Sequence, residues 1–170
     1  MHTLTRLLTG GAGLAVAVGG LLAPASLASA STPTCGNADL TASYRHSDNG
    51  AGHSYGWIVL RNTSGHTCST GGFGGISYVG DGNGTQIGAA AVRVGGPAKT
   101  YVLRPGQRLR SQVDEVTALN YPRKTCRPRH VDGFRIYVPN STLSQYVAHP
   151  TTGCRSHHVK LIHHKPYRRP

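Results

Sequence analysis

Signals for α-helix are nearly absent from this 170-residue chain. No window repeats its apolar residues with the 3.6-residue period of a helix, and Gly, Thr, Ser and Pro recur too often for long helices. This absence argues against helical bundles and alternating α/β folds. There is no C-x-x-C pair, which argues against cysteine-rich zinc sites. Acidic residues are also scarce, six against eighteen Lys and Arg, so the formal net charge is +12.

No apolar run is long enough to anchor the chain permanently in a membrane. The longest, Leu7–Ala23, contains five glycines and is shorter than the roughly 20 residues that a spanning helix needs. It follows one positive charge, Arg6, and precedes Ala28-Ser29-Ala30, which is the order of a secretory signal peptide. We therefore expect residues 1–30 to be cleaved and the mature chain to be secreted, without a transmembrane segment.

The chain after residue 30 is rich in strand signals. Short β-branched and aromatic runs are separated by turn clusters such as Asp81-Gly82-Asn83-Gly84. Eight or nine short strands at this spacing predict an all-β fold, an antiparallel β-sandwich, as a single domain over 31–164 with a basic C-terminal tail at 165–170. Ala118–Arg123 is expected to form a helical turn. The expected strands cover Asp39–Arg45, Tyr55–Asn62, Ile76–Val79, Gln86–Val94, Thr100–Leu103, Gln107–Val116, Val131–Val138, Leu143–His149 and His158–His163.

One strand is apolar on both faces. Tyr55, Trp57 and Val59 alternate on one side, and Ile58 and Leu60 lie on the other. This pattern is typical of a central strand. We therefore expect Trp57 in the core.

The stretch Gly52-His53-Ser54-Tyr55-Gly56 matches G-x-S-x-G, the nucleophile elbow of α/β-hydrolases. An elbow needs a strand before the serine and a helix after it. Here the order is reversed, because a loop at Ser47–Gly52 precedes Ser54 and a strand at Trp57–Leu60 follows it. No other group of residues forms an acid–base constellation. We therefore interpret Ser54 as non-catalytic and the chain as not an enzyme.

Four cysteines in an exported chain indicate two disulfides. Three connectivities are possible. We favour Cys35 with Cys68 and Cys126 with Cys154, because each pair ties a chain end to a neighbouring turn with few elements between. Each closes a loop of about thirty residues and would stabilise the fold by roughly 3–4 kcal/mol in the chain-entropy model.

Several short motifs occur in the order of one family. They are LRNTSGHTC at Leu60–Cys68, GFGGIS at Gly72–Ser77, LRPG at Leu103–Gly106, RIYVP at Arg135–Pro139 and TGC at Thr152–Cys154. Together they resemble the secreted actinobacterial family called domain of unknown function 4232. The resemblance extends from Cys35 to about His163. It implies an exported protein with an immunoglobulin-like β-sandwich and two disulfides, and it supplies no catalytic residues.

Histidines gather near the C-terminus, where His157-His158 and His163-His164 bracket Val159–Ile162. At about 3.3 Å per residue, His157 and His163 would share one face of a strand but lie about 20 Å apart, so one strand cannot collect four ligands. We expect a polar edge strand, with no metal site and no cofactor. Weak, adventitious binding of copper, nickel or zinc by this segment is an alternative.

Basic residues gather in two segments, before and after the second expected disulfide. If Cys126 bonds to Cys154, both segments lie at one end of the sandwich and could hold an anionic cell-wall polymer or a membrane surface. The alternative is charge that only maintains solubility. No nucleic-acid recognition motif appears, so sequence-specific binding of nucleic acid is not expected. The expected anion-binding residues are Arg123, Lys124, Arg127, Arg129, Arg155, Lys160, Arg168 and Arg169.

These observations predict a secreted, non-catalytic protein that binds an anionic component of the cell envelope through a basic end. A second hypothesis is a secreted protease inhibitor, because disulfide-bonded β domains of this size can display rigid loops. The third is a weak metal binder that uses the C-terminal histidines.

Overall fold

The computed structural model describes residues 31–170, so the expected signal peptide at 1–30 lies outside the described residues. The all-β prediction is confirmed. Among the described residues, no helix is long and apolar enough to cross a bilayer. Two short helices occur, η1 (Ala118–Asn120) and α1 (Arg123–Cys126). The strands are β1 (Leu40–Gly50), β2 (His53–Asn62), β3 (Cys68–Gly71), β4 (Gly75–Gly80), β5 (Thr85–Ile87), β6 (Val92–Arg93), β7 (Thr100–Leu103), β8 (Arg108–Val116), β9 (Pro128–Tyr137), β10 (Ser144–Cys154) and β11 (Ile162–His164).

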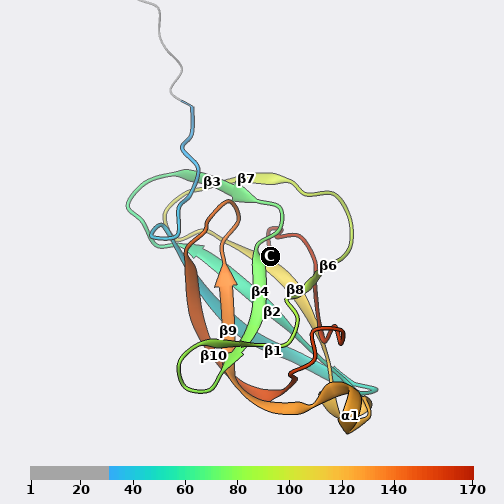
Figure 1. Ribbon diagram of the computed structural model, residues 1–170. Helices are drawn as coiled ribbons and strands as arrows, with labels where there is room; N and C mark the ends of the chain where they lie inside the picture. The colour runs from blue at the N-terminus through green and yellow to red at the C-terminus, as the bar shows by residue number, and fades with distance from the viewer. Residues whose placement is uncertain (1–30) are drawn as a thin grey trace, which may run out of the picture. The chain divides into compact units, whose positions relative to one another are not determined.

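The strands form a sandwich of two main sheets (Figure 1). One sheet has the order β1-β2-β8-β11-β6, the other has the order β10-β9-β4-β5, and a small β3-β7 sheet lies at one end. In Figure 1, α1 lies at the end opposite to β3 and β7. Neighbouring strands are antiparallel except β6 and β11, which pair in parallel. This one parallel pair departs from the predicted antiparallel pattern. It forms where the two-residue edge strand β6 pairs with β11, the last strand of the chain.

Alternating apolar side chains fill the space between the sheets. Ile58 and Leu60 of β2 are fully buried beside Leu109 and Val113 of β8, and Phe134 of β9 contributes from the opposite sheet. Each such side chain stabilises the fold by about 1.5–3 kcal/mol through burial. In β8 the period-2 pattern that predicted the strand therefore also gives its inner face.

Trp57 is not in the core, contrary to the prediction. It lies half-buried on the outer face of β2, and the guanidinium of Arg110 sits 4.2 Å from the centre of its ring. β2 is a central strand of its sheet, as predicted, but the two-sided apolar pattern does not say which face is inside. Ile58 and Leu60 take the inner face, and the stem of Arg110 shields Trp57 on the outside.

The segment 165–170, predicted as a basic tail, is packed against the sandwich. Tyr167 is 1% exposed and forms an antiparallel bridge with Gly72, while Arg168 forms one with Arg110 of β8. A single aromatic residue between a proline and an arginine has no periodicity, so sequence reading could not detect this packing.

Other strand predictions also needed correction, among them Leu143–His149, which is β10 and continues to Cys154. β1 extends to Gly50, with a register shift between His46 and Asp48, where a loop was expected. The run at Gln86–Val94 forms two short strands, and the expected strand at His158–His163 begins only at Ile162. β3 was missed, because its sequence, CSTG, has no apolar alternation. The described residues therefore contain eleven strands instead of eight or nine.

Both predicted disulfides are present. Cys35 bonds to Cys68, 33 residues apart, and ties the first described segment to β3. Cys126 bonds to Cys154, 28 residues apart, and ties α1 to the end of β10. Each bond should stabilise the fold by roughly 3–4 kcal/mol by restricting the unfolded chain.

Candidate functional site

The second disulfide brings two basic segments together. Arg123 begins α1, and Arg127 ends it in the left-handed conformation, with φ 52° and its backbone N–H donating to the Arg123 carbonyl. The backbone N–H of Arg155, just after β10, donates to the Arg127 carbonyl at 3.1 Å. The covalent bond between Cys126 and Cys154 reinforces these contacts. Segments almost thirty residues apart in the sequence are thus held side by side.

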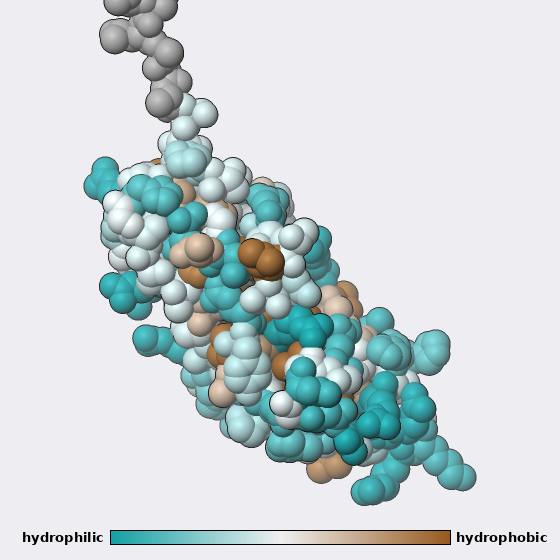
Figure 2. Space-filling model, turned by 60° about the vertical axis from the view of Figure 1, so that its left-hand side comes forward, coloured by the Kyte–Doolittle hydropathy of each residue, from teal (hydrophilic) through white to brown (hydrophobic). Residues whose placement is uncertain are grey.

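Four arginines surround a shallow depression of about 390 Å³ at this end, lined by Arg123, Arg127, Pro128, Arg129 and Arg155. We call it the basic end. All four arginines are exposed, and Figure 2 shows hydrophilic side chains gathered at this end of the molecule. Arg129 is paired with Asp81. Within residues 31–170, no carboxylate forms an ion pair with the other three arginines. Their charge is therefore available to an anion.

The other four predicted anion-binding residues do not line this depression. Lys124 is exposed on α1, and Lys160 is exposed on the turn before β11. Arg168 pairs with Arg110, and Arg169 donates to the Val102 carbonyl of β7 at 3.0 Å. The predicted patch is therefore divided, because the C-terminal segment runs along β8 and β7, away from α1.

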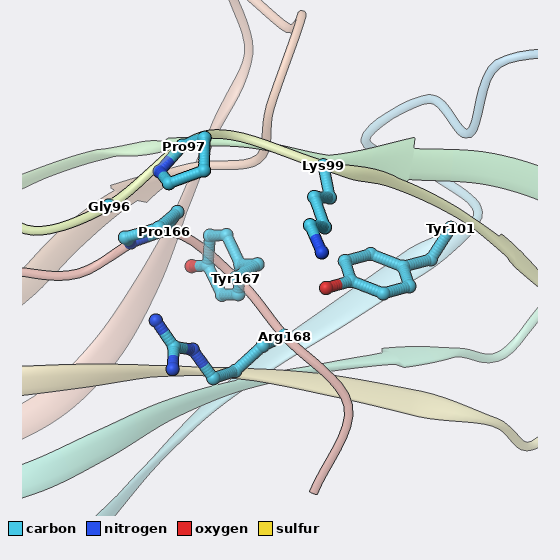
Figure 3. A pocket seen from close by; sticks show the side chains of 7 residues that line it. All are labelled: Gly96, Pro97, Lys99, Tyr101, Pro166, Tyr167 and Arg168. Carbon is cyan, nitrogen blue, oxygen red and sulfur yellow. The ribbon is translucent and has the colours of Figure 1, made fainter.

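A second concavity, of about 300 Å³, lies between the loop before β7 and the C-terminal segment (Figure 3). Lys99 and Tyr101 direct their polar ends toward each other on one side of it, and Arg168 lies below Tyr167 in this view. The Tyr167 hydroxyl is buried and has no hydrogen-bond partner among the described residues. Burial raises the pKa of Tyr167, so the hydroxyl keeps its proton.

Ser54 of the G-x-S-x-G match lies within β2, not at a strand-to-helix turn. Its Oγ is 3.5 Å from Nδ1 of His46, which is longer than the 2.6–3.2 Å expected for a nucleophile and its base. The glycines have structural roles. Gly52 has φ 79° in the hairpin turn, and a Cβ on Gly56 would lie 2.4 Å from the ring of Tyr44. The motif therefore serves the hairpin and the packing of Tyr44.

A buried carboxylate, which sequence reasoning missed, joins the two sheets. Glu115 of β8 is 4% exposed. It accepts hydrogen bonds from Tyr44 of β1 at 3.0 Å and from Tyr78 of β4, and it contacts Nε2 of His149 of β10 at 2.9 Å. Burial, followed by the charge of Glu115, raises the pKa of both tyrosines, so both remain donors. The adjacent concavity, of about 210 Å³, is lined in part by Ser54.

Glu115, Tyr44, Tyr78 and His149 form what we call the Glu115 cluster. Phe134 packs against it, with its ring stacked on His149 at 4.5 Å between centres. The alternation of β8 places Glu115 on the inner face, so the sequence could have indicated a buried carboxylate. Nothing in the sequence identifies its partners on distant strands.

The C-terminal histidines do not converge on one point. His157 and His158 are exposed in a turn, whereas His164 is buried with its Nδ1 3.3 Å from Ser111 Oγ. Burial and, second, the charge of Arg93 lower the pKa of His164 to about 4. Within residues 31–170, one group of ligand-type residues, Asp39, His66 and Cys68, lies close together. Its Cys68 sulfur is in a disulfide and cannot act as a thiolate ligand.

One comparison with known proteins gives a match. The model of the family described as Domain of unknown function (DUF4232) matches residues 35–163, which is most of the chain and includes all four cysteines. The chain belongs to this family. Membership in DUF4232 confirms which domain family the sequence motifs resemble. No curated protein and no solved structure matches the chain.

Proposed function

We propose that this DUF4232 protein is a non-catalytic binding protein that holds an anionic polymer of the cell envelope at its basic end. The observation that carries the proposal is the depression of about 390 Å³ surrounded by Arg123, Arg127, Arg129 and Arg155. Only Arg129 has a carboxylate partner among the described residues. Guanidinium groups bind phosphate and carboxylate oxygens through paired hydrogen bonds, so three of them around an open surface suit a flexible polyanion.

The conformation of Arg127 supports a role for its side chain. A non-glycine residue at φ 52° costs free energy that glycine would avoid, and glycine is the common residue after a helix. Keeping an arginine there retains a charge in the lining of the depression.

We also infer that the protein acts outside the cytoplasm of an actinobacterium, after removal of residues 1–30 as a signal peptide. The two disulfides are compatible with such a location, because disulfides persist in oxidising compartments. The leader pattern and the motif resemblance are the basis for the rest of this inference.

Retention on purified cell wall at two ionic strengths tests the proposal. The variant Arg123→Gln/Arg127→Gln/Arg155→Gln should bind roughly 100-fold more weakly at low salt, at about 1 kcal/mol for each lost cation. The control variant Lys99→Gln/Arg104→Gln/Lys165→Gln loses the same charge. It should bind cell wall about as tightly as the parent, because these exposed residues lie outside the basic end. Equal retention of the two variants, or retention that salt does not weaken, would contradict the proposal.

A further inference from the structure

A second cationic surface covers the outer face of the β1-β2-β8 sheet. The strand register places outward residues in rows across the strands. One row joins Arg61 to Arg108, the next joins Val59, Arg110 and Arg168, and the third joins Arg45 and Trp57 to Gln112. We call this surface, defined by Arg45, Trp57, Val59, Arg61, Arg108, Arg110 and Arg168, the arginine face.

None of the six acidic residues falls in these three rows. The nearest along β8 is Asp114, which is held by Nδ1 of His53 at 2.6 Å. Five arginines therefore share the arginine face without a carboxylate among them. This clustering exceeds what solubility needs, because mixed charge serves that purpose as well.

A notch of about 110 Å³ in the arginine face combines cationic and apolar walls, and it is lined by Arg45, Trp57, Val59, Arg108, Arg110 and Pro170. The guanidinium of Arg110 lies over the ring of Trp57, 4.2 Å from the ring centre. Nε of Arg110 is buried and has no hydrogen-bond partner among the described residues. The notch thus places guanidinium groups beside the apolar surfaces of Trp57 and Val59. This combination fits a ligand that joins anionic oxygens to short aliphatic units.

The spacing of the arginines suits a chain of phosphates. Arg108 and Arg110 are two residues apart on β8, which places them about 6.8 Å apart along the strand. Arg168 lies on the adjacent segment at the level of Arg110, about 5.5 Å away between Cα atoms for such a hydrogen-bonded pair. Consecutive phosphodiesters in a flexible polymer can meet cations at these intervals.

We propose that the arginine face binds a linear phosphodiester polymer without bases, of the poly(glycerol phosphate) type. Single-stranded nucleic acid fits less well, because it needs successive aromatic platforms for its bases. Trp57 is the only aromatic residue of the face, and Arg110 lies over its ring. The proposal relies on the proposed function only for the class of partner, because the arginine face and the basic end share no residue.

Trp57 is the only tryptophan of the chain, so its fluorescence reports on the arginine face and not on the basic end. Titration of the protein with synthetic poly(glycerol phosphate) should give a saturable change in Trp57 emission. The variant Arg45→Gln/Arg108→Gln/Arg168→Gln should bind roughly 100-fold more weakly. These three side chains are exposed, and Arg110 is left in place to keep the packing around Trp57. Matching thermal unfolding of variant and parent would show that the fold is kept.

The variant Arg123→Gln/Arg127→Gln/Arg155→Gln removes the same charge from the basic end and should leave the fluorescence titration unchanged. Cell-wall retention weaker than that of the parent in this variant, with an unchanged titration, would support both sites separately. An absent emission change, or equal weakening by the two variants, would overturn the arginine face. Tighter binding of an oligo(dT) strand or of anionic phospholipid vesicles than of poly(glycerol phosphate) would also overturn the assignment.

Discussion

Replacing Tyr78 by Phe removes one hydroxyl from the Glu115 cluster and leaves the ring in place. The ring remains stacked on Phe134, with 5.4 Å between centres, so little apolar burial changes. The lost hydrogen bond runs to a buried carboxylate, and hydrogen bonds to charged groups contribute about 1.5–3 kcal/mol. We expect the free energy of unfolding of the variant to be about 2 kcal/mol lower than that of the parent. This loss lowers Tm by roughly 8 °C in a domain of this size.

Urea denaturation and calorimetry of the parent and of Tyr78→Phe measure this difference. Tyr146→Phe is the matched control, because the Tyr146 hydroxyl donates to the Asp132 carbonyl at 2.9 Å from a residue that is 60% exposed. The control should lose less than about 0.5 kcal/mol. If Tyr78→Phe were as stable as the control, or more stable than the parent, the Glu115 cluster would not join the sheets in the way described.

Two further predictions follow from buried groups. The pKa of His164 is lowered to about 4 in the folded protein, from 6.5 in the unfolded chain. The stability that the neutral imidazole contributes is therefore complete above pH 6.5 and is lost as the pH falls toward 4. The loss in the free energy of unfolding is at most about 3 kcal/mol. Urea denaturation at several pH values should show this loss in the parent and a flatter profile in His164→Gln; equal slopes would contradict the assignment. Replacing Cys126 and Cys154 by Ser should cost roughly 3–4 kcal/mol and weaken retention on cell wall, because Arg127 and Arg155 would no longer be held together. Retention that survived this change would show that the disulfide does not organise the basic end.

The strands that alternate cleanly were predictable from the sequence. β8, RLRSQVDEV, places Leu109 and Val113 inward and its charged residues mostly outward, as the period of a strand requires. The disulfide pairing followed from the same layout, since each bond joins a chain end to a nearby turn. Both are local properties or concern segments that are close in the sequence.

Features that depend on distant segments were not predictable. Trp57 and Ile58 are both apolar, and the opposite sheet decides which one faces inward. Tyr167 carries no periodic signal, yet it is buried because Gly72 pairs with it across almost a hundred residues. The arginine face likewise arises from strand register and not from any run of basic residues, so the sequence showed only the cluster around Cys126 and Cys154.

The salt dependence of polymer affinity at the basic end tests the central claim most directly. A plot of the logarithm of the binding constant against the logarithm of salt concentration has a slope of about −0.7 for each phosphate contact in a flexible polyanion. Removing Arg123, Arg127 and Arg155 should make the slope less steep by about 2, as expected for three lost contacts. A slope equal to that of the parent would mean that these arginines do not contact the polymer, and the proposed function would be wrong.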